Sequence, residues 1–331
     1  MSLKIIKAGV LDTIQDLGRY GNQRLGINPG GAMDKFAMQT ANTLVGNNLS
    51  EAVIELHFPA SVFLFSQPAL IALSGADFSA SINGEPVANL HVIAVNKNDA
   101  LQFHRPVNGA RAYLAVYGGF EIEKWLGSGS TNLKIKAGGF HGRRLNKSDE
   151  LPFKCRNDFS ALLNKKEFRV LPWLADTSFP DDSKEILVLP GNEWDRLTVT
   201  SKEMFASTPF VVTKQSDRMG YRLGNNPLSA VSTEGLVSSA VGFGTIQLLP
   251  DGKLIVLMAD HQTTGGYPRI GHVITAHHSR LAQLKTGDGI WFRLTDQQTA
   301  EELLLKQNQH LLQLQNACTF RLQQYLQKHG Y

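Results

Sequence analysis

The chain has 331 residues, of which 42% are hydrophobic and 19% are charged, and its formal net charge is +4. This length suits about two domains of roughly 100–200 residues each, with enough apolar residues for a sizeable core. Lysine and arginine are scattered rather than grouped in tracts, which argues against a nucleic-acid-binding protein. No run approaches the roughly 18 apolar residues that a membrane span needs.

The termini and cysteines indicate where the protein works. Residues 1–7 alternate like a strand and lack the apolar segment of a signal peptide. Cys155 and Cys318 lie far apart without metal-ligand spacing, and we expect both to be reduced thiols. We therefore expect a cytoplasmic protein.

The first half of the chain is predicted to be a series of short strands. Asp34 could cap the N-terminus of a helix over 35–45, whose apolar positions recur at helical spacing. Asn83-Gly84 is a strong hairpin-turn signal. Residues 121–180 are less regular and are interpreted mostly as connecting structure; their glycine-rich loops at 127–131 and 138–142 could hold an anion, although no Walker-type lysine follows. The predicted strands cover 3–8, 52–56, 61–65, 69–74, 87–95, 100–104, 112–117 and 168–171.

The second half repeats this pattern and ends differently. A short helix is expected over 201–205, capped by Thr200 or Ser201, and a helix or turn over 277–284. Residues 299–328 contain no glycine or proline and have apolar positions near helical spacing, which predicts one long helix. The predicted strands cover 186–189, 210–213, 244–248, 254–258, 270–275 and 290–294. Many short strands with closely spaced turns favour a barrel or sandwich.

An internal repeat defines the domains. Five segments of the first half match segments of the second half in the same order: 5–9 with 187–191, 15–26 with 216–224, 53–56 with 245–248, 70–77 with 254–260, and 98–103 with 287–292. We therefore predict a mainly β protein with two β domains of one fold, over 1–183 (including the connecting segment) and 184–296, plus a C-terminal helix over 297–331. A groove between the two domains is the expected ligand site.

The polar run at 260–269 is the most informative stretch for function, because it follows an apolar strand and contains a carboxylate, an imidazole, hydroxyls, a phenol and a guanidinium. Asp260 could act as a general base or could cap the following loop amides. Tyr267 could bind a carbonyl group or pack as a half-buried ring. The simpler alternative for the whole run is a polar hairpin loop with turn glycines.

A second polar segment is expected to place Asp217, Arg218 and Arg222 in one loop. An arginine offers a planar fork of donors for a carboxylate or phosphate, whereas Asp217 is expected to pair with an arginine and fix the turn. The histidines lack zinc-ligand spacing, so no metal site is predicted. The sequence contains no Gly-x-Ser-x-Gly motif of a serine nucleophile and no recognisable pairing of a catalytic cysteine with a histidine. The residues by themselves indicate a polar cleft for a small anionic or amide-like ligand and do not name a reaction.

Three motifs carry a resemblance to a known family: residues 13–19 through 31–34, residues 216–223, and residues 260–268 with their Thr-Thr-Gly-Gly-Tyr-Pro core. Together they resemble the biotin-dependent carboxyltransferase-like family, also called allophanate hydrolase subunit 2, which includes the C-type subunits of 5-oxoprolinase and the kinase-inhibitor antagonists. The resemblance implies that the two domains are cyclophilin-like β-barrels. It does not extend to the glutamine-rich C-terminal helix, which could pack on the domains or form a homodimer.

The resemblance also implies a function. Family members of this size usually act with A-type and B-type partner subunits of 5-oxoprolinase in the ATP-dependent opening of 5-oxoproline to glutamate, and the ATP site is expected to be shared with a partner. Larger relatives use the same region to transfer a carboxyl group from carboxybiotin to urea, which is the alternative. This chain has no Met-Lys-Met motif for attaching biotin. A third alternative is a non-enzymatic antagonist of a kinase inhibitor.

Within the 5-oxoprolinase interpretation we assign roles to nine residues. Arg218 or Arg222 would bind the substrate carboxylate or a phosphorylated intermediate. Asp260, Thr264 and Tyr267 would position the amide or the attacking water. The remaining expected substrate-binding residues are Gln247, Arg19, Arg24 and Asp34, the last three on the opposite side of the site.

Overall fold

The computed structural model describes residues 2–155, 157–163, 168–178, 185–232 and 236–330. Contacts divide the chain into two units, each described separately below. The first unit comprises Met1–Gly18, Asp34–Ser178 and Gln309–Tyr331, and the second comprises Arg19–Met33 and Phe179–Asn308. Among the residues described, no helix is long and apolar enough to cross a membrane.

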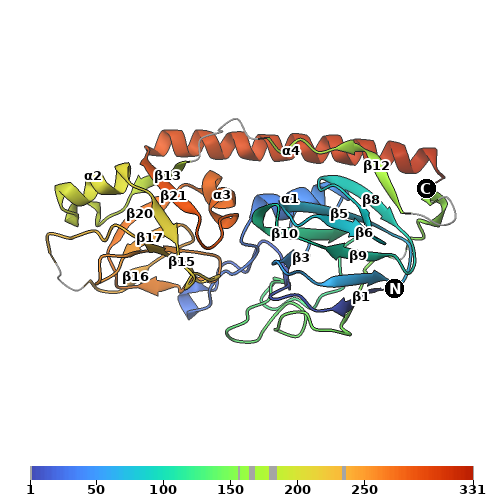
Figure 1. Cartoon of the computed structure of the whole chain (residues 1–331), viewed down its shortest axis with the longest axis horizontal. Helices are drawn as coiled ribbons and strands as arrows, with labels where there is room; N and C mark the ends of the chain where they lie inside the picture. The colour runs from blue at the N-terminus through green and yellow to red at the C-terminus, as the bar shows by residue number, and fades with distance from the viewer. Residues whose placement is uncertain (1, 156, 164–167, 179–184, 233–235, 331) are drawn as a thin grey trace. The chain divides into compact units, whose positions relative to one another are not determined.

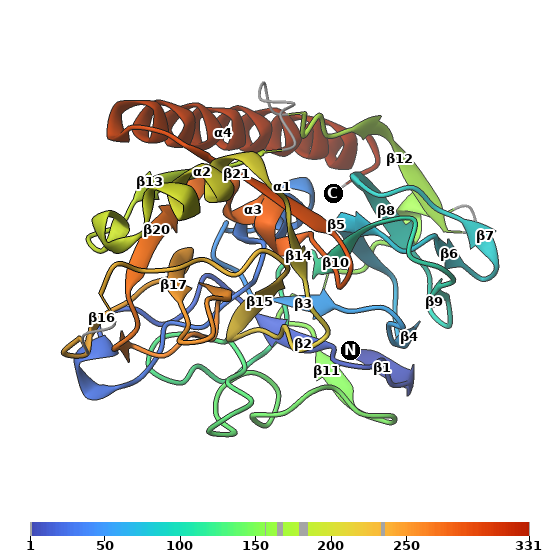
Figure 2. The ribbon, with the colours of Figure 1, turned by 60° about the vertical axis from the view of Figure 1, so that its left-hand side comes forward.

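Two six-stranded antiparallel sheets form the first unit (Figures 1 and 2). The first has the order β11 (Glu150–Pro152), β1 (Ser2–Lys7), β4 (Val62–Phe65), β9 (Ala100–Phe103), β6 (Ala80–Ile82) and β7 (Glu85–Pro86). The second has the order β12 (Arg169–Leu174), β8 (His91–Val95), β5 (Ala69–Asp77), β10 (Asn108–Val116), β3 (Val53–Leu56) and β2 (Thr13–Gln15). Alternate residues of these strands, such as Leu3 and Ile5, share one buried core.

Helix α1 (Lys35–Leu44) lies against β5 and β10 of this unit (Figure 1). The carboxylate of Asp34 accepts a hydrogen bond from the backbone N–H of Ala37 at 2.9 Å, so the predicted helix cap is confirmed. A short 3₁₀ turn, η2 (Ser160–Leu162), lies in the connecting region.

The second unit contains a closed barrel of seven strands. Their order is β13 (Glu185–Pro190), β20 (Arg269–Val273), β17 (Thr245–Leu248), β18 (Leu254–Leu257), β15 (Gly220–Gly224), β14 (Phe210–Val212) and β21 (Gly289–Leu294). Parallel pairing of β13 with β21 closes the barrel, and the other pairs are antiparallel. The barrel core is apolar and includes the stacked rings of Phe205 and Phe292, 4.9 Å apart between centroids.

Short elements complete the second unit. They are η1 (Gln23–Leu25), η3 (Trp194–Arg196), α2 (Val199–Ser207), η4 (Thr275–His277), α3 (His278–Ala282) and the two-stranded sheet of β16 (Ser239–Ala240) with β19 (Thr264–Gly265). The cap of α2 differs from our prediction. Thr198, not Thr200 or Ser201, is the N-cap residue, because its hydroxyl accepts a hydrogen bond from the N–H of Ser201 at 3.2 Å.

The C-terminal helix α4 covers Gln297–Lys328, starting two residues earlier than predicted. Asp296 caps this end by accepting a hydrogen bond from the N–H of Thr299 at 2.8 Å. In the second unit Ala300 and Leu303 pack against a small apolar cluster. In the first unit the Tyr325 ring lies edge-on to Trp173. Homodimer formation through this helix stays a prediction.

The mainly β class, the closed barrel in the second half and the C-terminal helix are confirmed. Two strand predictions were wrong. The strand expected over 87–95 begins only at His91, because Leu90 adopts a left-handed φ of 65° that interrupts extended backbone. The segment expected as a loop around Arg222 is strand β15, which pairs with β14 and β18.

Four of the five pairs of matched repeat segments fall on strands in both units, but these strands have different neighbours; residues 15–26 instead run from the last residue of β2 into η1. β17 and β18 pair directly in the barrel, whereas their first-unit counterparts, β3 and β5, both pair with β10. Likewise β13 pairs with β21, whereas β4 lies between β1 and β9. The sequence matches therefore locate strands correctly without giving equivalent strand order.

Candidate functional site

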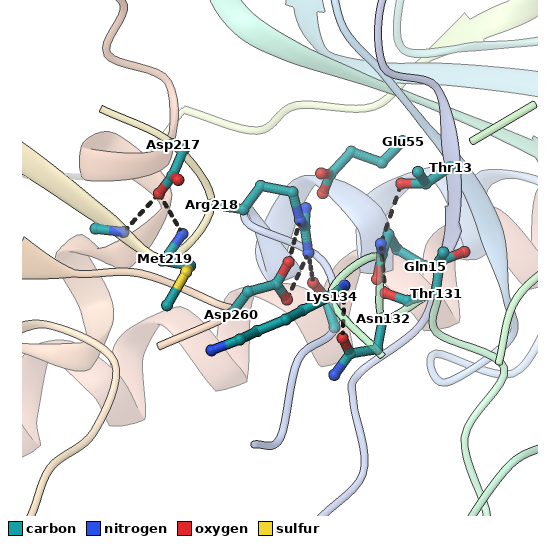
Figure 3. A network of polar contacts seen from close by, with 12 residues as sticks. Thr13, Gln15, Glu55, Thr131, Asn132, Lys134, Asp217, Arg218, Met219 and Asp260 are labelled. Carbon is teal, nitrogen blue, oxygen red and sulfur yellow. Dashed lines mark hydrogen bonds and ion pairs between the residues drawn. The ribbon is translucent and has the colours of Figure 1, made fainter. Parts of the chain in front are cut away.

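A buried ion pair joins two of the predicted motifs within the second unit (Figure 3). β15 pairs with β18 in a register that sets Gly220 opposite Leu257, and the N–H of Asp260 donates to the carbonyl of Arg218 at 2.8 Å. This backbone pairing brings the two side chains together. Arg218 Nε donates to Asp260 Oδ2 at 2.8 Å, and its Nη2 donates to Oδ1 at 3.3 Å. Side-chain exposure is only 6% for Arg218 and 14% for Asp260.

The same arginine binds the first motif, since Arg218 Nη2 also donates to the carbonyl of Gly31 at 2.7 Å. Gly30 has a φ of 61°, and a Cβ there would lie 3.1 Å from Arg19 Nη1 and 3.6 Å from Asp260 Oδ1. Arg19 is almost fully buried. Two guanidinium groups and one carboxylate therefore surround the glycine pair. Asp260 is an ion-pair partner in this arrangement, so a role as general base requires the pair to open.

A cavity of about 390 Å³ lies elsewhere on the barrel, over the outer faces of β15, β18 and β17. Arg222 pairs with Ile255 in the strand register, and Ile255 pairs with Gln247, so the three residues form one row. Their chain neighbours point into the core, which turns this row outward. We call this hollow the outer cavity; it is lined by Gln215, Asp217, Met219, Gly220, Arg222, Gln247, Leu249, Pro250, Asp251, Ile255, Gln262 and Tyr267.

Gln247 is 1% exposed, although it points away from the barrel core. Its Oε1 accepts a hydrogen bond from Gln262 Nε2 at 3.4 Å. Its Nε2 has no hydrogen-bond partner among the residues that the structure describes. A Cβ at Gly265 would lie 2.5 Å from this nitrogen, so the first glycine of the Thr-Thr-Gly-Gly-Tyr-Pro motif leaves room for the amide.

Charged groups of both signs line the outer cavity. The exposed Arg222 guanidinium has no hydrogen bond or ion pair with any described residue. Asp217 Oδ1 accepts hydrogen bonds from the N–H groups of Met219 at 2.8 Å and Gly220 at 3.2 Å (Figure 3). Asp217 thus fixes the turn as expected, but through backbone amides rather than through an arginine. The cavity can offer a ligand a cation, an amide donor and a carboxylate acceptor.

None of the other predicted site residues lines the outer cavity. Thr264 is exposed on β19, opposite Ala240 of β16, and Arg24 is exposed on η1. Asp34 belongs to the first unit, where it caps α1 and is 1% exposed. The structure therefore groups Arg222, Gln247 and Tyr267 in one cavity, and Arg218, Asp260 and Arg19 around Gly30. The functional roles of all nine residues stay predictions, as does the groove between the two halves.

The glycine-rich loop at 127–131 does hold an anion, and that anion is a carboxylate of the same chain. Asp16 accepts hydrogen bonds from the Ser128 hydroxyl at 2.6 Å, the Gly129 N–H at 2.6 Å and the Ser130 hydroxyl at 2.5 Å. A fourth comes from the Gly18 N–H at 2.8 Å. This loop therefore fixes the start of the first motif.

Arg269, the last residue of the polar run, also forms an ion pair within the chain. Its Nε and Nη2 donate to the two oxygens of Glu193 at 3.0 and 2.8 Å. These hydrogen bonds hold the pKa of Glu193 below its usual value. Burial, together with the positive charge of Arg269, lowers the pKa of His272 on the same strand. Within the described part of the chain, no three His, Cys, Asp or Glu side chains are grouped to hold a metal ion.

Sequence reasoning missed Gln262, and it gave Asp217 no place in a cavity. Gln262 lies in the polar run, but its contact with Gln247 depends on how the loop folds over β17. A partial signal was present, because Arg222, Ile255 and Gln247 each stand between two core residues of a short strand. That alternation does not indicate which strands are neighbours in the barrel.

Comparison with known proteins gives the family. The family model described as carboxyltransferase domain, subdomain A and B, matches residues 25–294. The chain belongs to this carboxyltransferase family.

Relatives of this carboxyltransferase-family chain include two bacterial proteins of similar length, both C-type subunits of 5-oxoprolinase. The chain is 36% identical to the one from Escherichia coli K12, over 88% of this chain and 90% of that protein. It is 35% identical to the one from Haemophilus influenzae, over 91% and 94% of the two chains.

A solved structure resembles the carboxyltransferase-family chain over nearly its whole length. The crystal structure of the Kluyveromyces lactis urea carboxylase matches with a TM-score of 0.83 and 25% identity. The match covers 95% of this chain and only 29% of the urea carboxylase chain. The chain therefore spans less than a third of that larger protein.

Proposed function

We propose that the chain is the carboxyltransferase-family component of an ATP-dependent 5-oxoprolinase and acts with A-type and B-type partner subunits. The overall reaction converts 5-oxo-L-proline, ATP and water to L-glutamate, ADP and phosphate. The observation that carries the proposal is the 36% identity to the C-type subunit of E. coli 5-oxoprolinase over almost the full length of both proteins.

The outer cavity suits the chemistry of this substrate. 5-Oxoproline is a lactam that carries a carboxylate, and its amide is resonance-stabilised, so opening requires activation of the lactam carbonyl. Phosphoryl transfer from ATP to the lactam oxygen would supply that activation. Water then attacks the carbonyl carbon, the ring C–N bond breaks to free the amine, and a second water releases phosphate from the resulting acyl phosphate. The cavity offers the Arg222 guanidinium and the Gln247 amide to hold and orient the substrate.

We assign the main ATP-binding surface to one of the partner proteins. Binding of a triphosphate needs a cradle of backbone N–H groups, usually completed by a lysine. The glycine-rich loop at 127–131 instead presents two serine hydroxyls and one backbone N–H, and all three donate to the Asp16 carboxylate. The loop therefore does not fit a nucleotide phosphate, and no step is assigned to ATP on this chain.

Reconstitution tests the proposal. The purified chain is mixed with A-type and B-type subunits, and glutamate formed from 5-oxo-L-proline is measured with and without ATP. We expect glutamate formation that requires both ATP and this chain. An equal rate from the partner subunits alone would overturn the proposal.

The match to urea carboxylase favours one alternative, a carboxyltransferase subunit that uses carboxybiotin on a separate carrier. Carboxybiotin would supply the carboxyl group to be transferred. The outer cavity also fits this group, because a carboxylated ureide could bind the Arg222 guanidinium and the Gln247 amide. Transfer of labelled carboxyl from a carboxylated carrier protein to urea, dependent on this chain, would support the alternative. Tight binding to a B-type subunit without binding to biotin would exclude it.

A further inference from the structure

We propose that the outer cavity binds a cyclic amide or ureide that carries a carboxylate. In this site Arg222 binds the carboxylate, Gln247 Nε2 donates to the ring carbonyl, and Asp217 accepts a hydrogen bond from the ring N–H. The inference deepens the proposed function and rests on it for the choice of 5-oxo-L-proline as the first ligand. A carboxylated ureide shares the same chemistry.

The strand register places the two main groups at a suitable separation. Arg222 and Gln247 lie in one row, with Ile255 of the intervening strand between them. Neighbouring strands are about 4.8 Å apart, so their backbones are about 10 Å apart across two strand spacings. Two long side chains can reach both ends of a single five-membered ring over that span. Ile255 provides an apolar floor for the ring methylenes.

The buried Gln247 amide indicates that a ligand acceptor belongs here. Its Nε2 is shielded from solvent and has no hydrogen-bond partner among the residues described. An unpaired buried donor costs free energy unless something accepts its hydrogen bond. Gln247 lines the outer cavity, and a carbonyl oxygen bound there would be that acceptor once the amide turns toward it.

The arginine on this row differs from other arginines of the same unit. Arg218 pairs with Asp260, Arg269 with Glu193, and Arg293 with Glu185. Arg222 makes no ion pair with a described residue, yet it lines a cavity that also contains Asp217. The Asp217 Oδ1 atom is used by the turn, and its Oδ2 remains for a donor on the ligand.

Ligand titrations test this assignment on the full chain, alone and mixed with its partner subunits. Isothermal titration calorimetry would compare 5-oxo-L-proline with 2-pyrrolidinone, which lacks the carboxylate, and with L-proline, which lacks the ring carbonyl. Biotin represents the ureide class. The variants are Arg222→Gln and Gln247→Leu. Arg293→Gln is the matched control, since it removes the same charge from an exposed strand position outside the cavity.

We expect wild type and Arg293→Gln to bind 5-oxo-L-proline equally. Each cavity variant should weaken binding by about tenfold or more, because each loses a hydrogen bond to a charged or buried group. 2-Pyrrolidinone should bind weakly, and Arg222→Gln should not weaken it further. Gln247→Leu should unfold at the wild-type temperature or above it, because it removes a buried donor without a partner. If it unfolds at a lower temperature, the exposed Arg222→Gln decides the test.

The outcomes separate this inference from the proposed function. If 5-oxo-L-proline binds with unchanged affinity to both cavity variants, the site is wrong while the 5-oxoprolinase function stands. If biotin binds with the same dependence on Arg222 and Gln247 and 5-oxo-L-proline does not bind, the site is retained for a ureide and the proposed function fails. If none of these ligands binds to the chain or to its complex, the inference is overturned.

Discussion

Replacing Arg218 by alanine should strongly destabilise the second unit. The substitution leaves the Asp260 carboxylate, only 14% exposed, without the guanidinium that donates two hydrogen bonds to it. Removing one partner of a buried ion pair costs about 3–5 kcal/mol. The lost hydrogen bond to the carbonyl of Gly31 adds about 1 kcal/mol. We therefore expect the free energy of unfolding to fall by about 4–6 kcal/mol.

The structure offers a matched control for this prediction. Arg293 also pairs with a carboxylate, that of Glu185 at 3.1 Å, but the two side chains are 56% and 43% exposed. Exposed pairs contribute at most about 1 kcal/mol, because water and salt screen them. Arg293→Ala should therefore cost at least about 3 kcal/mol less than Arg218→Ala.

Native-state hydrogen exchange of β15 and β18 would measure both variants, because these strands belong to the second unit and flank the ion pair. A loss of about 4 kcal/mol corresponds to roughly 1,000-fold faster exchange of amides that open with the whole unit. If Arg218→Ala exchanges no faster than Arg293→Ala, the buried pair does not hold the motifs together and our account of the site is refuted.

Three further predictions concern other parts of the chain. Burial raises the pKa of Asp12 from 3.8 to about 6, so the folded state binds its proton more tightly than the unfolded state does. The free energy of unfolding of the first unit should therefore fall by about 3 kcal/mol as pH rises from about 4 to about 6 and remain lower above that, and Asp12→Asn should remove this fall in pH-dependent urea unfolding. Asp16→Ala should destabilise the first unit by about 3 kcal/mol in urea unfolding, because it leaves four hydrogen-bond donors without an acceptor. A change below about 1 kcal/mol would contradict our interpretation that the loop at 127–131 is stabilised by binding the Asp16 carboxylate. Gly265→Ala should displace the Gln247 amide and raise the KM for 5-oxo-L-proline in the reconstituted enzyme severalfold. Gly266→Ala is the control and should have a KM near that of wild type, because its Cβ would meet no atom closer than 3.3 Å. Equal KM values for the two variants would argue against a role for the Gln247 amide.

Local patterns were sufficient for most elements of the fold. Strand alternation located most of the longer buried strands of both units, and the apolar spacing after Asp34 predicted α1 together with its cap. These features depend on residues a few positions apart, so periodicity and hydrogen-bonding chemistry are enough to predict them. β15 was missed because its polar residues and terminal glycines resemble a loop, and only pairing with β14 and β18 makes it a strand.

The candidate site was only partly predictable for the same reason. The sequence indicated that Arg218, Arg222, Asp260 and Tyr267 belong to polar motifs with a shared family resemblance. It did not separate Arg218, which is buried in an ion pair with Asp260, from Arg222, which lines the outer cavity. That separation depends on the tertiary structure, because Arg218 precedes β15 and meets Asp260 beyond the end of β18, whereas Arg222 lies within β15.

By itself, the sequence determined the mainly β class, most of the longer strands, the long C-terminal helix and the family motifs, because each of these depends on residues close together along the chain. Tertiary structure alone decided which strands are neighbours, that the loop at 127–131 binds Asp16, and that residues 19–33 join the second unit. The physical reason is that these outcomes rest on contacts between distant residues, such as the hydrogen bond from Arg218 to Gly31. Folding of each unit brings these distant residues together, and no local pattern in the sequence indicates which of them will meet.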